Sequence, residues 1–570
     1  MKVFFFNVKW VYFFNIYFQI SQKEITRILS DKSYDKMERL IYLSSFLDLD
    51  RMKLHIGFLF RSMEGRIREL ISSVIQLEMD RQKLLNRLKQ EEEYDVLVVG
   101  GGATGLGVAL DAMSRGFKVA LVEKVDFGKG TSSKATKLLH GGVRYLQNGD
   151  VALVIEALKE REFVLTQAPH LSRIQKFVIP HYTQWQGWYY WAGLKTYDIL
   201  SGTRSLGTTR KISREETLEI LPNLKQAGLK GGIEYTDGQF DDTRLCIDLV
   251  STINHKGGAI LNYCALESFT YDDNGNIKGG IVKNQMTEEI FEVRSKSVVN
   301  ATGVFAEQIM SLESDDTDIK IVPARGSHIV LDRSFLQSDE AIMIPKTSDG
   351  RVLFLVPWHN VVIAGTTDVV SPELTMEPKA TEEEIRFILN NATEYLEKKP
   401  KIEDILSTFA GLRPLAAPKR EGKKSKEISR SHKVVISKAG LVSVLGGKWT
   451  TFRKMGEDTI DKIIKKGKLP LKESKSEAVK IYNGTPKSIG DRIHPDLPYT
   501  WTEMEKYIKE ELVENVEDLL CRRTRCILLH KQATLDILDQ AIQLIARIKG
   551  YDEIWEGKQR WDFAEIAKNY

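Results

Sequence analysis

The chain has 570 residues, of which 82 are basic and 78 acidic, giving a formal net charge of +4. Hydrophobic residues make up 42% of the chain and charged residues 28%, a composition typical of globular proteins that excludes wholesale disorder. The small net charge, without a long lysine or arginine stripe, argues against nucleic-acid binding, and the length predicts several domains.

The four cysteines form no C-x-x-C pair and lie far from any histidine cluster with zinc-ligand spacing. We therefore expect reduced thiols and no metal site. These cysteines are Cys246, Cys264, Cys521 and Cys526.

Residues 1–93 are predicted to form an N-terminal extension that is helical or partly disordered. The first 22 residues are aromatic and lack acidic groups, as in a signal, an anchor or an interfacial segment. None of these fits well, because there is no small-residue cleavage site, no arginine typical of a transit peptide, and Lys9 would be buried in a spanning helix. A misassigned start codon fits equally well. Residues 24–93 have apolar residues at helical spacing, which favours a docking or coiled element.

A new pattern begins at residues 94–99, YDVLVV, a β-branched run typical of a strand buried on both faces. It leads into GGGATG at 100–105, a G-x-G-x-x-G followed by a helical pattern. Gly100 permits the tight turn, Gly102 lets the backbone approach a pyrophosphate, and Gly105 lets the helix pack closely on the strand.

A second strand is predicted at residues 117–123, FKVALVE. It ends in Glu123, about 20 residues after the glycines, where a ribose hydroxyl needs an acceptor. Strand, glycine turn, helix and strand in this order predict a Rossmann dinucleotide site, and the alternative is a glycine turn without a ligand.

Two later segments favour FAD over a nicotinamide cofactor. Residues 298–303, VVNATG, resemble the second flavin-domain signature of two-domain FAD enzymes, and residues 446–451, GGKWTT, resemble the late glycine turn beside the flavin pyrimidine ring. No second G-x-G-x-x-G follows a strand, so a separate NAD(P) site is not indicated.

Five blocks carry a closer resemblance. Residues 131–146 read TSSKATKLLHGGVRYL, and four further blocks lie at 343–351, 357–359, 365–368 and 411–415. In this order they resemble the FAD-dependent, quinone-linked glycerol-3-phosphate dehydrogenases of mitochondria and aerobic bacteria. The resemblance covers residues 94–570, including CRRTR at 521–525. The chain contains no D-x-[DN]-x-[DN]-G loop, so calcium control is not predicted.

The resemblance implies an α/β plus α+β fold. A Rossmann-type FAD-binding domain is expected from residues 94–180, 238–320 and 405–465. It is interleaved with a mixed-sheet substrate domain, 181–237 and 321–404, and followed by an α-helical C-terminal domain, 466–570.

The family's reaction takes a hydride from C2 of glycerol 3-phosphate to flavin N5 and leaves dihydroxyacetone phosphate. The phosphate dianion requires several cations, and arginine is favoured because its planar fork binds two oxygens. The positions that match the family are Arg144, Arg413, Arg430 and Lys448, with Tyr145 as a further donor.

A general base must remove the C2 hydroxyl proton, and histidine is the natural candidate. We favour His328 over His140 as this base, while Lys448 is expected to polarise the hydroxyl and Arg413 is counted with the catalytic groups. The residues expected to bind the cofactor are Gly100, Gly102, Gly105, Glu123, Ser132, Ser133, Lys137, Leu139, Gly141, Thr302, Gly303, Gly447 and Thr450.

Because the family's dehydrogenases reduce ubiquinone at a membrane, we expect peripheral membrane association. A homodimer is a separate possibility. The expected location is the mitochondrial inner membrane in a eukaryote, or the cytoplasmic face of the cell membrane in a bacterium. An aromatic cluster, residues 185–191 followed by Lys195, fits a lipid interface, and the alternative is an aromatic core segment.

Three competing functions remain. A glycerol-3-phosphate oxidase would use oxygen in place of a quinone. An amine or amino-acid oxidase would not need the set of cations, and a non-catalytic flavin-binding scaffold would not need a substrate phosphate site.

Overall fold

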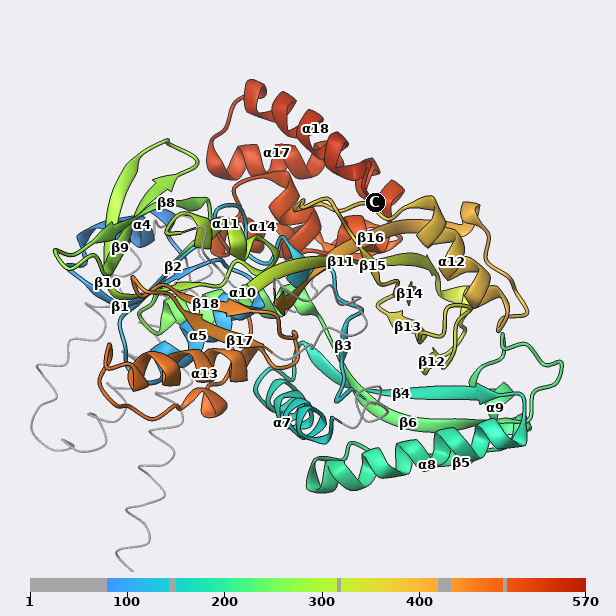
Figure 1. Ribbon diagram of the computed structural model, residues 1–570. Helices are drawn as coiled ribbons and strands as arrows, with labels where there is room; N and C mark the ends of the chain where they lie inside the picture. The colour runs from blue at the N-terminus through green and yellow to red at the C-terminus, as the bar shows by residue number, and fades with distance from the viewer. Residues whose placement is uncertain (1–78, 143–149, 315–318, 419–431, 485–489) are drawn as a thin grey trace, which may run out of the picture. The chain divides into compact units, whose positions relative to one another are not determined.

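The computed structural model describes residues 79–142, 150–314, 319–418, 432–484 and 490–570, which form two β-sheets and a C-terminal helical region (Figure 1). The first 78 residues of the predicted extension lie outside this part of the chain. The helix α4 (Arg81–Gln90) belongs to the predicted helical stretch, and its Leu84, Leu85 and Leu88 are buried. It begins at Asp80, whose carboxylate caps the helix by accepting from Lys83 N.

The first sheet has the predicted Rossmann core. Its strands run in the order β17-β18-β10-β1-β2-β7, with β8 and β9 extending from β10. Strand β1 is parallel to both β10 and β2, so Val98 lies between Val299 and Leu121. The strands are β1 (Tyr94–Val99), β2 (Val119–Val122), β7 (Ala259–Leu261), β8 (Cys264–Tyr271), β9 (Ile277–Asn284), β10 (Ile290–Asn300), β17 (Lys433–Ile436) and β18 (Val442–Leu445).

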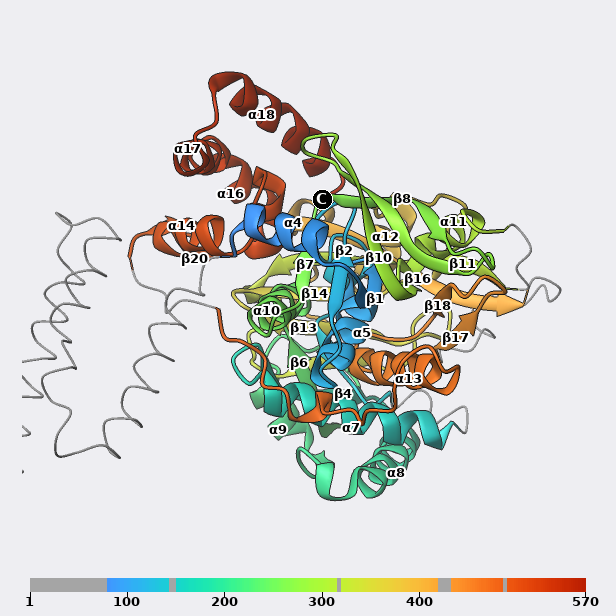
Figure 2. The ribbon, with the colours of Figure 1, turned by 90° about the vertical axis from the view of Figure 1, so that its left-hand side faces the viewer.

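Helices α5 (Ala103–Ser114) and α13 (Phe452–Lys465) cross at glycines beside this sheet (Figures 1 and 2). A methyl group on Gly107 would lie 2.2 Å from Phe452 O, and one on Gly456 would lie 2.1 Å from Gly107 O. The backbones therefore approach as closely as only glycine permits.

The second sheet is mixed, as predicted for the substrate domain. Its order is β15-β11-β14-β13-β12-β4-β6-β3, with β16 beside β11 and β5 beside β6. Strands β12 and β4 are parallel, whereas its other pairings are antiparallel. The strands are β3 (Leu138–Leu139), β4 (Ser172–His181), β5 (Arg210–Ile212), β6 (Gly231–Phe240), β11 (Ile319–Asp332), β12 (Ala341–Ile344), β13 (Leu353–Trp358), β14 (Val361–Gly365), β15 (Val369–Val370) and β16 (Ile405–Pro418).

Three strands that we expected within the FAD-binding segments pair in the second sheet instead. These are β3, β4 and β16. The long pairing of β11 with β16, from Ile319 opposite Pro418 to Leu331 opposite Ile405, places residues 405–418 there. The local sequence shows that a strand forms, but the choice of partner depends on residues far along the chain.

Further helices surround the two sheets. Capping boxes start two of them, with Thr183 and Gln186 at α8, and Thr381 and Glu384 at α12. The helices are α7 (Val151–Gln167), α8 (Gln184–Ser201), α9 (Arg214–Ile220), α10 (Asp242–His255), α11 (Ala306–Ser311) and α12 (Glu382–Thr393).

The C-terminal region is helical, as predicted, after a short hairpin of β19 (Arg492–His494) and β20 (Leu497–Thr500). Its apolar core includes Val330, Trp358 and Phe409, so it packs directly on the second sheet. The helices are α14 (Trp501–Glu510), η9 (Asp518–Arg523), α15 (Cys526–Leu529), α16 (Lys531–Asp536), α17 (Leu538–Lys549) and α18 (Glu553–Ala567). Across the described ranges, we find no helix with both the length and the apolar character needed to span a membrane.

Candidate active site

A cavity of about 640 Å³ is lined by residues of both sheets. One part is formed by the glycine turn after β1 and the loop after β2, and another by His328, Phe354 and Arg413 of the second sheet. The volume lies within the range of cofactor and substrate sites.

The glycine turn at 100–105 has the backbone geometry predicted for a dinucleotide site. Gly100 has a φ of +109°, and a methyl group there would lie 2.7 Å from Ala301 O. A methyl group on Gly105 would lie 1.9 Å from Gly100 O, so Gly105 permits α5 to start directly behind the turn. Gly102 precedes the first residue of α5 and lines the cavity. The turn therefore offers backbone N–H groups at a helix N-terminus to an anionic ligand.

Glu123 and Ser132 tie the following loop to this turn. The two Glu123 carboxylate oxygens accept from Gly101 N at 2.7 Å and from Val125 N at 3.0 Å, and Ser132 Oγ accepts from Ala103 N at 2.9 Å. Burial raises the pKa of Glu123, and the two backbone donors oppose that shift. Glu123 and Ser132 both line the cavity.

His328 lies on β11, and its ring stacks on Phe409 with centroids 4.5 Å apart. Its Nε2 is 2.9 Å from Thr136 Oγ1, and Nδ1 has no hydrogen-bond partner among the described residues. Burial, and then the positive charges of Arg413 and Lys137, hold the pKa of His328 well below its usual value. The imidazole is therefore neutral near pH 7 and able to accept a proton.

Arg413 extends from β16 toward the same cavity. Its Nη1 donates to Thr367 O at 3.1 Å and its Nη2 to Thr366 Oγ1 at 3.0 Å, while Asp368 lies 3.4 Å away. The side chain remains 25% exposed. These contacts fix the orientation of the guanidinium at the cavity wall.

Lys448 follows two glycines in left-handed conformations, Gly446 with φ +75° and Gly447 with φ +92°. This turn lines the cavity together with Trp449, whose Nε1 donates to Ser132 O at 2.8 Å. The late glycine turn is thus joined to the loop that follows β2, although 317 positions separate the two residues.

Most of the described site residues that we predicted line the cavity. They are Gly100, Gly102, Glu123, Ser132, His140, Thr302, Gly303, His328, Arg413, Gly447, Lys448 and Thr450. The predicted residues Arg144, Tyr145 and Arg430 lie outside the described residues.

Five predicted cofactor contacts do not line the cavity, namely Gly105, Ser133, Lys137, Leu139 and Gly141. Within residues 134–142 the cavity is lined by Lys134, Ala135, Thr136, Leu138, His140 and Gly142. Lys137 is turned away and buried, and its Nζ lies 2.7 Å from Asp242 Oδ2. No local feature of the sequence distinguishes Lys134, Thr136 and Leu138, which line the cavity and were not predicted, from Lys137.

Gly105 lies behind the turn and acts through packing alone. Within the described ranges we find no group of three His, Cys, Asp or Glu side chains placed to hold a metal ion. The arrangement thus combines a glycine turn at a helix N-terminus, cationic side chains that include Arg413 and Lys448, and the imidazole of His328 at one cavity.

Two family models and a relative from Caenorhabditis elegans match this chain. A family model described as FAD dependent oxidoreductase matches residues 95–453, and one described as the C-terminal domain of alpha-glycerophosphate oxidase matches residues 473–554. A Caenorhabditis elegans protein, "Probable glycerol-3-phosphate dehydrogenase, mitochondrial", is 35% identical over 568 residues, covering 90% of this chain and 78% of its own length.

Two solved structures share the fold. The FAD complex of glycerol-3-phosphate dehydrogenase from Bacillus halodurans superposes with a TM-score of 0.69 at 24% identity, covering 86% of this chain and 97% of its own. The FAD-bound L-alpha-glycerophosphate oxidase from Mycoplasma pneumoniae gives a TM-score of 0.52 at 19% identity, covering 65% and 94%. At these identities, both support the fold alone.

Proposed function

The chain belongs to the family of FAD-dependent glycerol-3-phosphate dehydrogenases, and we propose that it oxidises sn-glycerol 3-phosphate to dihydroxyacetone phosphate and passes the electrons to a membrane quinone. The observation that carries this proposal is one cavity that joins a glycine turn at a helix N-terminus to Arg413, Lys448 and the buried His328.

The residues at the first sheet fit FAD. Gly100 and Gly102 leave the backbone open to a pyrophosphate, and Glu123 directly follows β2, where a ribose acceptor is expected. Thr302, Gly303, Gly447 and Thr450 line the same cavity and would hold further parts of the cofactor. FAD, when bound, supplies a hydride acceptor.

Arg413 and Lys448 supply the charge for the substrate phosphate in this proposal. A guanidinium held by Thr366 and Thr367 loses little freedom when it binds a phosphate. Arg144, Arg430 and Tyr145 complete the predicted phosphate site.

His328 is proposed to remove the proton of the C2 hydroxyl. Its ring is fixed by Phe409 and Thr136, and the neutral form is the one that accepts a proton. The charge of Arg413 lowers the pKa of His328, so a phosphate dianion bound at Arg413 would offset that charge and strengthen the base. Substrate binding would thereby prepare proton removal. His140 also lines the cavity but is exposed, and it is the alternative base.

We further propose that helix α8 meets a membrane surface. Trp185 and Ile199 are each 77% exposed, and Trp188 and Tyr189 are also exposed, whereas Tyr190 and Trp191 pack at the second sheet. Exposed aromatic residues of this kind suit the headgroup region of a bilayer. The mitochondrial names of the relatives favour a mitochondrial location, at the inner membrane in this proposal, and a homodimer remains a prediction.

The test is anaerobic reduction of the purified flavoprotein by glycerol 3-phosphate, followed by reoxidation. Loss of the flavin absorbance and rapid reoxidation by a short-chain ubiquinone are expected. Fast peroxide release in air would instead support the oxidase, and unchanged absorbance would reject the substrate.

A further inference from the structure

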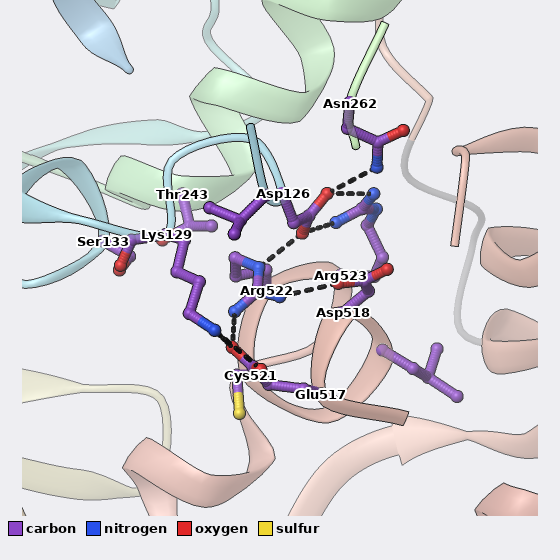
Figure 3. Close-up of polar contacts among 12 residues, drawn as sticks. Asp126, Lys129, Ser133, Thr243, Asn262, Glu517, Asp518, Cys521, Arg522 and Arg523 are labelled. Carbon is purple, nitrogen blue, oxygen red and sulfur yellow. Dashed lines mark hydrogen bonds and ion pairs between the residues drawn. The ribbon is translucent and has the colours of Figure 1, made fainter. Parts of the chain in front are cut away.

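A buried cluster of charges joins the C-terminal helical region to the loop after β2 (Figure 3). That loop, residues 123–130, contributes Glu123, Asp126 and Lys129 to the cavity wall. Its partners come from η9, almost 400 positions further along the chain. A segment outside both sheets is thus in contact with the dinucleotide end of the cavity.

Asp126 is the centre of the cluster. Arg523 binds its carboxylate with both nitrogens of the guanidinium fork, at 2.6 and 2.9 Å, and Arg522 donates to it through Nε. Asn262 donates to the same carboxylate at 2.9 Å. With three donor residues, the carboxylate has a single orientation, and the charges of the two arginines hold the pKa of Asp126 well below its usual range.

The cluster also extends along the loop. Lys129 Nζ donates to Glu517 Oε2 at 2.8 Å, and Glu517 Oε1 accepts from Arg522 at 2.6 Å. A third arginine of the same segment, Arg525, donates to Ser133 O at 2.8 Å. Two points of the loop, residues 126 and 129, and Ser133 just after it are therefore attached to residues 517–525.

These attachments act on the groups that face the cofactor. Between β2 and Asp126 lie only three residues, and the first is Glu123, which accepts from Gly101 N of the glycine turn and from Val125 N of its own loop. Gly128 N also donates to Gly101 O at 3.1 Å. Displacing Asp126 would shift this loop against the turn.

We propose that Arg523, with Arg522, is a positioning residue for FAD: by holding Asp126 it keeps loop 123–130 in the shape that binds the dinucleotide. The C-terminal region is then part of the cofactor site, although it need not touch the cofactor. The inference rests on FAD binding, and its test uses no glycerol 3-phosphate, so a wrong substrate assignment would leave it intact.

The experiment measures the FAD dissociation constant of the full-length, deflavinated protein by flavin fluorescence, together with its unfolding by circular dichroism. Asp126→Asn and Arg523→Gln are expected to raise the Kd about tenfold or more, the size of effect that supporting hydrogen-bond partners have in metal sites. The double variant, Asp126→Asn with Arg523→Gln, removes one negative and one positive charge. It is expected to regain stability relative to Asp126→Asn while its Kd remains raised.

Glu160→Gln is the control, because Glu160 forms a buried ion pair with Arg453 at 2.5 Å and, among the described residues, is hydrogen-bonded to neither the loop nor Arg523. It is expected to lower stability and leave the FAD Kd unchanged. If Asp126→Asn does not fold, Glu517→Gln tests the outer link, with an expected rise in Kd of about threefold. If Asp126→Asn, Arg523→Gln and Glu517→Gln fold and bind FAD with the wild-type Kd, the proposal is overturned and the cluster has a purely structural role.

Discussion

The guanidinium of Arg413 lies directly over Gly326, so that a methyl group on Gly326 would come within 2.3 Å of Nη2. The two residues are on neighbouring strands, where Gly326 pairs with Gly411 and Arg413 pairs with Ala324. The absent side chain at Gly326 is thus what allows Arg413 to adopt its position at the cavity.

Replacing Gly326 by alanine is therefore expected to displace the Arg413 guanidinium. Because the obstructed atoms are the end of a flexible side chain, the fold should retain its stability while kcat/KM for glycerol 3-phosphate falls about 10- to 100-fold. Steady-state kinetics and thermal unfolding measure the two effects. Gly557→Ala is the control, because a methyl group there meets nothing within 4 Å. Unchanged kinetics in Gly326→Ala would contradict the role given to Arg413.

Removing the Arg413 side chain with Arg413→Ala should raise KM steeply, by about 100-fold, because a partly buried phosphate loses a charged donor pair. The flavin absorbance spectrum should be unchanged, since Arg413 belongs to the second sheet. Arg413→Lys keeps the charge but not the fork and should lose less. Equal KM values for all three proteins would reject the phosphate site.

His328→Gln should lower kcat about 10²- to 10⁴-fold if His328 is the general base. His140→Gln is the matched comparison, since His140 lines the same cavity and is the alternative base. Single-turnover reduction of the flavin measures the affected step. A greater loss of kcat in His140→Gln than in His328→Gln would make His140 the general base.

His328 should also affect stability at low pH. Its folded-state pKa is held well below the unfolded value of about 6.5, so the unfolded chain binds the extra proton as the pH falls below that value. The wild-type protein should therefore lose up to about 1.4 kcal/mol per pH unit more than His328→Gln below pH 6.5. Denaturant unfolding at pH 7.5 and 5.5 measures this difference, and equal losses in both proteins would mean that His328 is not buried as a neutral ring.

Helix α8 should lose membrane affinity when its exposed apolar side is removed. Tyr189 and Ile199 follow Trp185 by four and fourteen positions, so all three lie on one side of the helix. Replacing them together with glutamine should weaken binding to vesicles of phosphatidylcholine and phosphatidylserine at least about tenfold. The double variant Ile554→Gln and Trp561→Gln on α18 is the control for a general loss of exposed apolar surface. Equal weakening in both would argue against α8 as the membrane-facing element.

The Rossmann core was predictable because its signals are local. The β-branched run at 94–99, the glycines at 100, 102 and 105, and Glu123 each determine the backbone within a few residues. Glu123 and Gly447 line the same cavity, although 324 positions separate them in the chain.

Side-chain direction and strand partners were less predictable. The loop at 134–142 resembled the family as a block, but the direction of each side chain depends on backbone bends such as the left-handed φ of +65° at Lys137. Thr136 was therefore not predicted, and Lys137 does not line the cavity. The Asp126 cluster carried no signal either, because an aspartate in a loop and two arginines near the C-terminus become partners only through tertiary packing.

The strand order of the first sheet determines when β1 can pair with both of its neighbours during synthesis. Strand β1 is made early and pairs with β2 on one side, but its other neighbour, β10, begins 191 residues after β1 ends. At ribosomal rates of about 5 to 20 residues per second, the apolar edge of β1 waits roughly 10 to 40 s for its partner. Such an edge favours aggregation. The nascent chain therefore exposes an aggregation-prone edge of β1 before the second half of the cofactor cavity has been synthesised.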